Sequence, residues 1–183
     1  MPALAECDLL PVQQARAGSP EAWDILFRRY QLPLYAYVFE LVHHEQASLD
    51  IVQEAFISAA RHLDGLREDG KFGSWLFGIA HQRCIQRWRR QGREEVPEDG
   101  IEDNACEFAE GPDELLIREE QETAFMTLIQ KLPPPQRSVL LLHVIEDFPL
   151  DEIATITGAP LGTVKSRLHH ARKTLRRLVA HNA

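Results

Sequence analysis

The feature that most constrains the fold is an acidic segment in the middle of the chain, residues 94–122. It carries thirteen Asp or Glu residues against the single basic residue Arg118, and two prolines and two glycines interrupt it. Its first part cannot bury enough apolar area to offset the entropy of ordering it, and self-repulsion should keep it extended. The sequence therefore predicts two small domains, residues 1–93 and 113–183, joined by a flexible acidic linker at 94–112.

The N-terminal part reads as a series of amphipathic helices, and no strand-like alternation is evident in the chain. Gly18 is expected to end a first short helix. Ser19 as N-cap and Pro20 at the first helical position indicate the start of the next one. Pro33 is expected to divide that helix in two, and Ser48 to start the one after. The fold class predicted is all-α.

The helix after Ser48 shows two distinct faces. One apolar stripe at helical spacing is predicted to be buried, and it consists of Leu49, Val52, Phe56, Ala59 and Leu63. Asp50, Gln53 and Glu54 fall on another face, at positions i, i+3 and i+4. They form a compact acidic patch that should point away from the core.

A helix over residues 74–90 is apolar in its first half and basic in its second. Arg83, Arg87 and Arg90 recur on one face, beside an aromatic set made of Phe72, Trp75, Phe77 and Trp88. Aromatic side chains next to a basic track suit the unstacked bases of a single nucleic-acid strand. The alternative is that the tryptophans belong to the core, and for Trp75 we favour the core because large aromatics dominate core burial.

The C-terminal part predicts a small helical bundle that ends in a basic helix. One helix, striped by Leu116, Phe125, Leu128, Ile129 and Leu132, stops before three prolines at 133–135. A strongly apolar helix, "PQRSVLLLHVIEDF", follows. Next come the short helix "LDEIATIT", the turn "GAPLG" and a long helix that contains "GTVKSRLHHARKTLRR". That stretch holds six Lys or Arg residues, two His residues and no acid.

Two helices joined by a tight glycine-containing turn are typical of a helix-turn-helix, which sets its second helix into a major groove of DNA. Ile153, Ile156 and Leu161 are expected to pin the first helix to the second. The buried face of the second is predicted to consist of Val164, Leu168, Leu175 and Leu178. A solvated basic face or one that binds an acidic protein is the alternative. The turn in front of the basic helix favours DNA.

Groove chemistry suggests a division of work along the second helix. The residues left outside the buried face are Lys165, Ser166, Arg167, His169, His170 and Arg172, and those near the start of the helix can reach base edges. Arg172 together with Lys173, Arg176 and Arg177 lies further along, where phosphate contacts are expected.

Three blocks of this chain together resemble those of an extracytoplasmic-function (ECF) sigma factor, the small two-domain class of bacterial sigma factors. They are "LDIVQEAFISAARHLDGL", "KFGSWLFGIAHQRCIQRWRR" and "LPPPQRSVLLLHVIEDFPLDEIATITGAPLGTVKSRLHHAR". The resemblance covers nearly the whole chain in order. It implies a subunit that binds core RNA polymerase and directs promoter-specific transcription initiation, with domain 1–93 as sigma region 2 and domain 113–183 as sigma region 4.

The resemblance also implies roles for particular residues. The helix with Asp50, Gln53 and Glu54 matches the segment that docks on the coiled coil of the largest polymerase subunit. The loop and helix from Leu66 onward match the element that captures a flipped base of the minus-ten motif. Its candidate DNA contacts are Leu66, Lys71, Phe72, Gln82, Arg83, Arg87 and Arg90. The candidate contacts to the minus-thirty-five motif are Thr163, Lys165, Ser166, Arg167, His169, His170, Arg172, Lys173, Arg176 and Arg177.

The family pattern gives the acidic linker a role as well. It matches the segment that threads toward the active-site cleft and the RNA exit channel, where an extended polyanion could occupy a positively charged channel. The formal net charge of the whole chain is −8, and without residues 94–122 the remainder would carry +4. The acidic average thus hides two basic surfaces. An anti-sigma factor is a further expected partner.

This sequence departs from the family pattern at three positions. Leu66 stands where some relatives have an aromatic residue, so base capture there would rest on the shape of a pocket. His169 and His170 stand where arginine or an aromatic is frequent, and a neutral histidine is a weaker partner for phosphates and bases. The promoter preference therefore cannot be carried over from the family.

Other functional classes find little support. Cys7, Cys84 and Cys106 are odd in number and widely spaced, which favours reduced thiols over a disulfide framework. His81 and Cys84 at i and i+3 raise the idea of a zinc or redox site with His43 and His44 nearby, but that is not a recognised ligand spacing, so packing is preferred and no metal or cofactor is expected.

The start of the chain lacks a signal-peptide pattern and no apolar run is long enough to span a bilayer, so a cytoplasmic protein is expected. Neither a nucleotide-binding glycine loop nor an acid–base set appears, so an enzyme is not expected. Two rivals stay open. One is a sigma-like decoy that sequesters an anti-sigma factor, and the other is a free-standing helix-turn-helix regulator.

Overall fold

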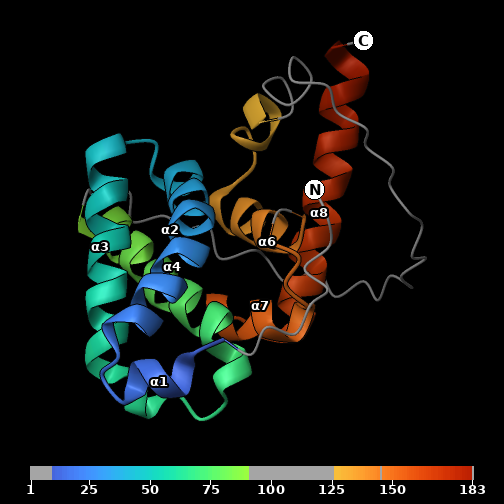
Figure 1. The fold of residues 1–183 in the computed structure, drawn as a ribbon. Helices are drawn as coiled ribbons and strands as arrows, with labels where there is room; N and C mark the ends of the chain where they lie inside the picture. Colours follow the sequence, from blue (N-terminus) through green and yellow to red (C-terminus); the bar gives the residue numbers. More distant parts are fainter. Residues whose placement is uncertain (1–9, 91–125, 145, 183) are drawn as a thin grey trace.

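The computed structural model describes residues 10–90, 126–144 and 146–182, and these form the helices shown in Figure 1. The N-terminal domain consists of α1 (Val12–Arg16), α2 (Pro20–Val42), α3 (Glu45–His62), the short 3-10 turns η1 (Leu63–Gly65) and η2 (Asp69–Lys71), and α4 (Phe72–Arg90). The C-terminal domain is built on α6 (Pro134–Val144), α7 (Leu150–Thr157) and α8 (Leu161–Asn182). The all-α fold is confirmed, while the predicted linker at 94–112 lies outside the described residues.

The turn after the first helix and the start of the second helix are as predicted. Gly18 has φ +88°, a left-handed conformation that glycine adopts without steric cost, and it follows the end of α1. Ser19 caps α2, since its side chain accepts a hydrogen bond from the backbone N–H of Ala22 at 3.2 Å. Pro20 occupies the first helical position, where no intrahelical donor is needed.

The expected break at Pro33 is wrong, because α2 runs without interruption from Pro20 to Val42. A proline inside a helix leaves the carbonyl of residue i−4 without its usual donor and costs about 3 kcal/mol. Here residue i−4 is Arg29, which is exposed, so water can reach that part of the helix. One buried face spans both sides of the proline and holds the two halves in line, and it includes Ala22, Leu26, Leu34, Tyr37, Val38 and Leu41.

The predicted start of α3 at Ser48 is also wrong. The N-cap is His44, whose Nδ1 accepts a hydrogen bond from the N–H of Ala47 at 3.2 Å. Ser48 lies inside the first turn, fully buried, and its hydroxyl donates to the carbonyl of His44 at 2.9 Å. An imidazole acceptor replaces the usual hydroxyl or carboxylate here, and this choice is invisible to a rule based on Ser, Thr, Asp and Asn.

The apolar stripe of α3 is buried with one exception. Val52, Phe56, Ala59 and Leu63 are between 0 and 8% exposed. Leu49, which was predicted to continue the stripe, is 47% exposed and points away from the core. It therefore belongs to the outer face of α3.

The C-terminal domain contains the predicted helix-turn-helix. Helix α7 covers the expected residues, and Gly158 ends it in the left-handed conformation at φ +67°. The two helices are held together by a buried set formed by Ile153, Ile156, Val164, Leu168, Ala171 and Leu175. Leu161 was expected to join that set, but it is 42% exposed at the start of α8, where the turn has not yet brought the helix against α7.

The two domains pack against each other rather than standing apart. Helix α4 lies against α7, and α2 lies against α6, so the C-terminal domain covers one side of the N-terminal bundle (Figure 1). Buried apolar residues from both domains form one continuous cluster. Helix α3 lies on the opposite side of the N-terminal domain from this contact.

Candidate polymerase and promoter-binding surfaces

The outer face of α3 carries the predicted acidic patch. Asp50, Gln53 and Glu54 are all exposed, on the face opposite the buried stripe. The Asp50 carboxylate accepts a hydrogen bond from the Gln46 side-chain amide at 3.1 Å. Glu54 forms an ion pair with Arg83 of α4. The patch is therefore accessible, with two of its three members partly oriented by neighbours.

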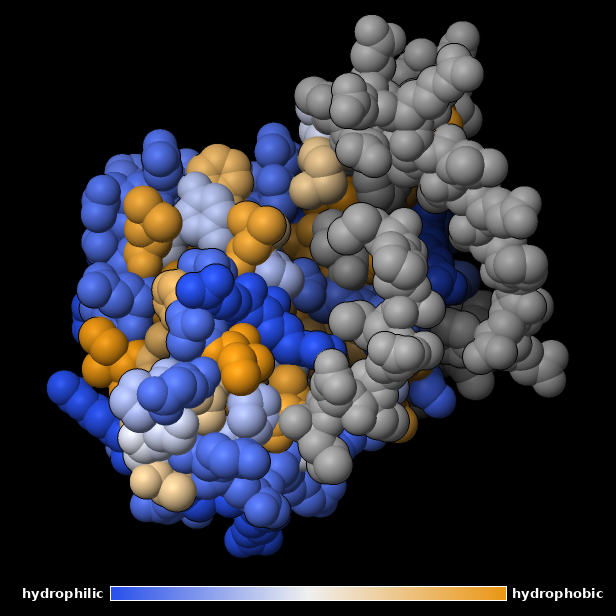
Figure 2. Space-filling model, viewed as in Figure 1, coloured by the Kyte–Doolittle hydropathy of each residue, from blue (hydrophilic) through white to orange (hydrophobic). Residues whose placement is uncertain are grey.

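Two apolar side chains on the same face were missed by the sequence analysis. Leu49 and Ile57 of α3 are 47% and 43% exposed and flank the polar patch along the helix. Figure 2 shows apolar side chains among the polar surface on the α2 and α3 side of the molecule. Acids flanked by exposed aliphatics are more typical of a protein contact than of a purely solvated face. The spacing of Leu49 fits either face of the helix, so spacing alone could not separate the two.

The loop that was expected to capture a base holds its apolar members inside the core. Leu66 is 8% exposed and Phe72 is not exposed at all. The Phe72 ring packs against Tyr30 and Trp23, with centroids 5.5 and 6.3 Å away. Both predicted contacts would have to leave the core before their side chains could touch a base. Trp75, favoured as a core residue, is partly buried and packs on the core edge.

An arginine that the sequence analysis did not consider holds this loop in place. The Arg16 guanidinium donates to the carbonyl of Leu66 at 3.1 Å and to the Asp69 carboxylate at 2.9 Å. It reaches across from the end of α1, about fifty residues earlier in the chain. No local sequence pattern predicts such a contact, because a lone arginine at the end of a short helix is usually solvated.

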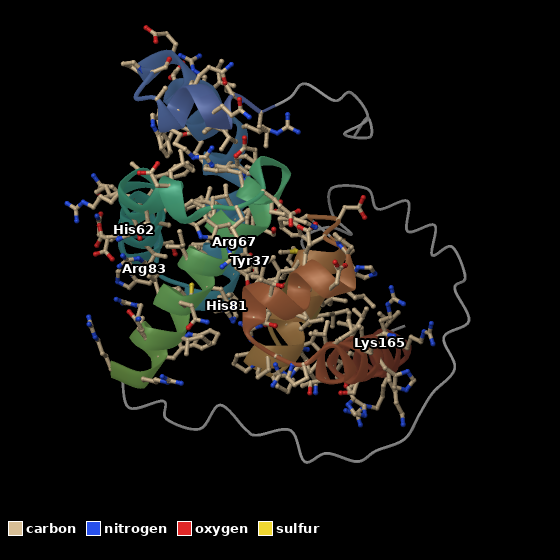
Figure 3. The ribbon with its side chains drawn as sticks, turned by 90° about the horizontal axis from the view of Figure 1, so that it is seen from below. Tyr37, His62, Arg67, His81, Arg83 and Lys165 are labelled. Carbon is tan, nitrogen blue, oxygen red and sulfur yellow. The ribbon has the colours of Figure 1, made fainter. Side chains whose placement is uncertain are left out.

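The remaining candidate minus-ten residues follow α4 and differ in accessibility. Arg90 and Gln82 are exposed, whereas Arg83 and Arg87 are partly buried. Arg83 is paired with Glu54, so the candidate strand-binding and polymerase-binding surfaces share an ion pair, and Figure 3 shows Arg83 at the side of α3. Lys71, just before α4, is engaged by Glu152 of α7 at 2.6 Å.

Helix α8 presents most of the predicted contact residues on its outer surface. Lys165, His169, His170, Lys173, Arg176 and Arg177 are exposed, and Thr163, Ser166, Arg167 and Arg172 are partly buried. The Ser166 hydroxyl donates to the Thr163 carbonyl at 3.0 Å. The rings of His169 and His170 lie 5.8 Å apart between centroids, in an edge-to-face arrangement. A cationic, convex helix surface of this kind can enter a major groove.

His81 and Cys84 are core residues of α4. His81 is 4% exposed, its Nδ1 lies 2.8 Å from the Tyr37 hydroxyl, and burial lowers its pKa to about 4. Cys84 is fully buried, and burial raises the pKa of its thiol to about 12. In the part of the chain that the structure covers, no group of three potential metal ligands comes together. Figure 3 shows His81 and Tyr37 together where α4 faces the C-terminal domain.

Comparison with known families matches both domains. Residues 26–94 match the family described as Sigma-70 region 2, and residues 122–175 match Sigma-70 region 4. Within the described ranges, no helix is both long and apolar enough to cross a membrane.

Curated relatives match over nearly the full length. The RNA polymerase sigma-H factor of Pseudomonas aeruginosa is 33% identical, and the match covers 93% of this chain and 92% of that protein. The ECF RNA polymerase sigma-E factor of Escherichia coli K12 is 32% identical, with 92% of each chain covered. The ECF sigma factor SigW of Bacillus subtilis is 29% identical over 91% of this chain and 93% of its own length.

Solved structures agree with the fold. CnrH, solved in complex with the cytosolic domain of CnrY, superposes with a TM-score of 0.69 at 23% identity, covering 97% of this chain and all of that one. The sigma factor RpoE of Bartonella quintana, solved with the anti-sigma factor NepR, gives a TM-score of 0.62 at 25% identity, covering 85% and 96%. The matched regions, the near full-length relatives and the exposed helix-turn-helix lead to one conclusion: this chain belongs to the extracytoplasmic-function group of RNA polymerase sigma factors.

Proposed function

We propose that this sigma factor uses three separate surfaces to start transcription. The outer face of α3 binds core RNA polymerase, the α4 side of the N-terminal domain binds and holds the minus-ten strand, and α8 reads the minus-thirty-five motif as duplex DNA. The protein acts in the cytoplasm and supplies no catalytic chemistry of its own. The observation that carries the proposal is the helix-turn-helix, in which Gly158 turns the chain so that the cationic face of α8 points outward.

The α3 contact rests on the mixed character of its outer face. The carboxylates of Asp50 and Glu54 attract and orient a basic partner surface, while Leu49 and Ile57 supply apolar area that water leaves on binding. A basic coiled coil of the polymerase is a partner of matching chemistry. Binding would also compete with Arg83 for the Glu54 carboxylate.

For the minus-ten strand, the burial of Leu66 and Phe72 shifts the proposed contacts to the polar residues around them. Lys71, Gln82 and the arginines of α4 meet the phosphates, and base capture requires the loop held by Arg16 to rearrange. Unstacking a base costs a few kcal/mol, which binding to such a surface can offset without nucleotide hydrolysis.

The domain limits follow the proposed roles. Residues 1–93 form region 2, residues 113–183 form region 4, and residues 94–112 link them. We place the acidic linker in a positively charged channel of the polymerase because its charge is complementary to such a channel. An anti-sigma factor is the proposed regulator, and the solved complex of RpoE with the anti-sigma factor NepR supports this choice.

The α3 surface is tested by double charge reversal, Asp50→Lys with Glu54→Lys, in the full chain. The matched control is Asp24→Lys with Asp64→Lys, which makes the same change of charge at exposed sites on α2 and η1. The first variant should lose at least about tenfold in affinity for core polymerase, because attraction becomes repulsion at the interface, and the control should change little. Equal loss in both variants would refute the α3 assignment.

The α8 surface is tested by Arg176→Ala with Arg177→Ala and duplex DNA of several sequences. Because cations that neutralise phosphates release counterions, the double variant should bind every sequence more weakly. Its salt dependence should also be flatter, by about 0.9 in slope for each phosphate that is no longer neutralised. A change confined to one base preference would instead assign these arginines to base recognition.

Run-off transcription with core polymerase separates the proposal from its main rival. A sigma factor initiates at some promoter, whereas a decoy binds an anti-sigma factor tightly and initiates at none. The exposed cations of α8 support the first outcome, because a decoy that never binds DNA does not require a cationic helix face.

A further inference from the structure

The loop between α3 and α4 is fixed at two points by one side chain from an earlier helix. Arg16, the last residue of α1, donates through Nη2 to the carbonyl of Leu66 at 3.1 Å and to the Asp69 carboxylate at 2.9 Å. Its Nε lies 4.0 Å from the carboxylate of Asp64. Residues 66–68 belong to no helix, so contacts of this kind decide where their backbone lies.

Helix α1 is a firm support for Arg16 because it is itself held against α2. Val12 and Ala15 of α1 are buried in the core. The indole N–H of Trp23 in α2 donates to the carbonyl of Ala15 at 3.1 Å. The ring of Trp23 also packs edge to face against Phe72, the residue that follows the loop, with centroids 6.3 Å apart. Trp23 therefore contacts both the helix that carries Arg16 and the end of the loop that Arg16 holds.

Arg16 also changes the charge that the loop presents to a nucleic-acid strand. Residues 63–71 carry three acids and two bases, so the loop by itself is net acidic. Arg16 adds a third cation and places it beside two of the acids, Asp64 and Asp69. Phosphates are repelled by carboxylates and attracted by guanidinium groups. A strand that approaches the loop therefore meets less repulsion when Arg16 is present.

The held carbonyl bears on how the loop can distinguish one base from another. The Leu66 side chain is 8% exposed, so a captured base must displace it. While Arg16 holds the carbonyl, the side chain of Leu66 can rotate away and its backbone stays in place. A site held to within about 0.5 Å favours one ligand shape over others. A loop without this restraint would adapt to any base, and its discrimination would fall.

A second arginine makes a long-range contact of a different kind. Arg137 of α6 is 8% exposed, and its Nη1 donates to the carbonyl of Glu40 at 3.1 Å and to His43 Nε2 at 2.8 Å. The last carbonyls of a helix lack intrahelical donors, so Arg137 caps the end of α2. That contact is enclosed and stabilises a helix end. The side chain of Arg16 is 29% exposed and holds a surface loop instead.

We propose that Arg16 is a positioning residue for base recognition at the minus-ten motif. It touches no base and acts through the backbone of the loop, which it holds at Leu66 and Asp69. The proposal rests on the proposed function, which assigns this loop to the minus-ten strand. Arg16 lies outside residues 26–94, the part of the chain that matches Sigma-70 region 2. Discrimination by the loop thus depends on a helix that precedes the matched region.

Hydrogen exchange in the full chain tests the positioning directly. Arg16→Met removes both hydrogen bonds and keeps an unbranched apolar stem. The amides of Leu66 and Lys71 donate to carbonyls three residues earlier, and both should exchange about tenfold faster in this variant, with the amides of α3 unchanged. The control is Arg28→Met, which removes an exposed Arg–Asp ion pair of α2. Equal exchange of the loop amides in Arg16→Met and the wild type would overturn the proposal.

Base recognition is tested by transcription with core polymerase from a template library randomised over both promoter motifs. Each template carries a barcode in its transcribed part, so sequencing the transcripts gives the base preference at every position. Arg16→Met should lower the preference at one minus-ten position by at least about fivefold, the least that one good base contact supplies. The minus-thirty-five preferences should not change, and Arg28→Met should match the wild type. Unchanged minus-ten preferences, or a loss in both motifs, would overturn the proposal.

Affinity for core polymerase separates positioning from general damage to the domain. It should be the same for Arg16→Met and the wild type, because the outer face of α3 is not altered. A loss of core affinity would overturn a role confined to the loop. If the wild type gave no transcript from any template, the proposed function itself would fail. The exchange rates of the loop amides do not depend on that result.

Discussion

Replacing His81 with glutamine should make the protein less sensitive to acid. His81 is 4% exposed, contacts the Tyr37 hydroxyl and lies in the field of Arg167. Burial first, and then the positive charge of Arg167, lower its pKa from 6.5 to about 4. Between these two pKa values His81 is therefore neutral in the folded protein and protonated in the unfolded chain.

The direction and size of the effect follow from linkage. Above pH 6.5 His81 is neutral in the folded and unfolded states, so its burial does not lower the free energy of unfolding through protonation. As the pH falls below 6.5 the unfolded chain gains a proton and the folded one does not, so stability is lost until about pH 4. A difference of about 2.5 pKa units corresponds to roughly 3 kcal/mol when fully expressed, and to about 2 kcal/mol at pH 5.

Urea unfolding at pH 7.5 and pH 5.0 measures this difference. Between the two values, the wild type should lose about 2 kcal/mol more of its unfolding free energy than His81→Gln, because glutamine keeps a polar partner for Tyr37 but does not titrate. The control is His62→Gln, which replaces an exposed histidine of α3 and should leave the acid sensitivity as it is. Equal losses for the wild type and His81→Gln would show that His81 accepts a proton in the folded state.

Two other groups give further predictions. Burial raises the pKa of Glu146 to about 7. Glu146→Gln should therefore raise the melting temperature at pH 8, where the native carboxyl must ionise in a partly buried position, and the gain should vanish below about pH 4.5. A gain of equal size at both pH values would exclude ionisation as its cause. Cys84, whose thiol has a pKa of about 12, should resist iodoacetamide at pH 8 in a Cys7→Ser/Cys106→Ser chain and react once urea unfolds it. Rapid labelling of the native chain would refute its burial.

The features that the sequence predicts most clearly are helix caps and backbone turns. Gly18, Ser19 and the limits of α7 were predictable because caps and left-handed turns depend on a few adjacent residues. The predictions at Pro33 and Ser48 were wrong for the same reason, because they considered only adjacent residues. In α2 the packing of one long face outweighs the local cost of proline, and in α3 a histidine replaces the usual cap.

The composition of the exposed helix faces was less predictable from the sequence than the limits of the helices. Helical spacing located the acidic patch of α3 and the cations of α8, but spacing alone did not say that Leu49 faces solvent or that Phe72 is fully buried. The packing of the domains was beyond prediction from the sequence. Which two amphipathic surfaces meet depends on contacts between residues far apart, such as Lys71 with Glu152, and no periodic pattern encodes them.

Arg137 also limits how the two domains can diverge in evolution. Its partners at the end of α2 lie 94 and 97 residues earlier in the chain. A mutation of His43 therefore alters the surroundings of a guanidinium in the other domain. Exchanging region 4 between two sigma factors would separate that pair. Hybrid proteins should then lack the contact by which Arg137 caps the end of α2.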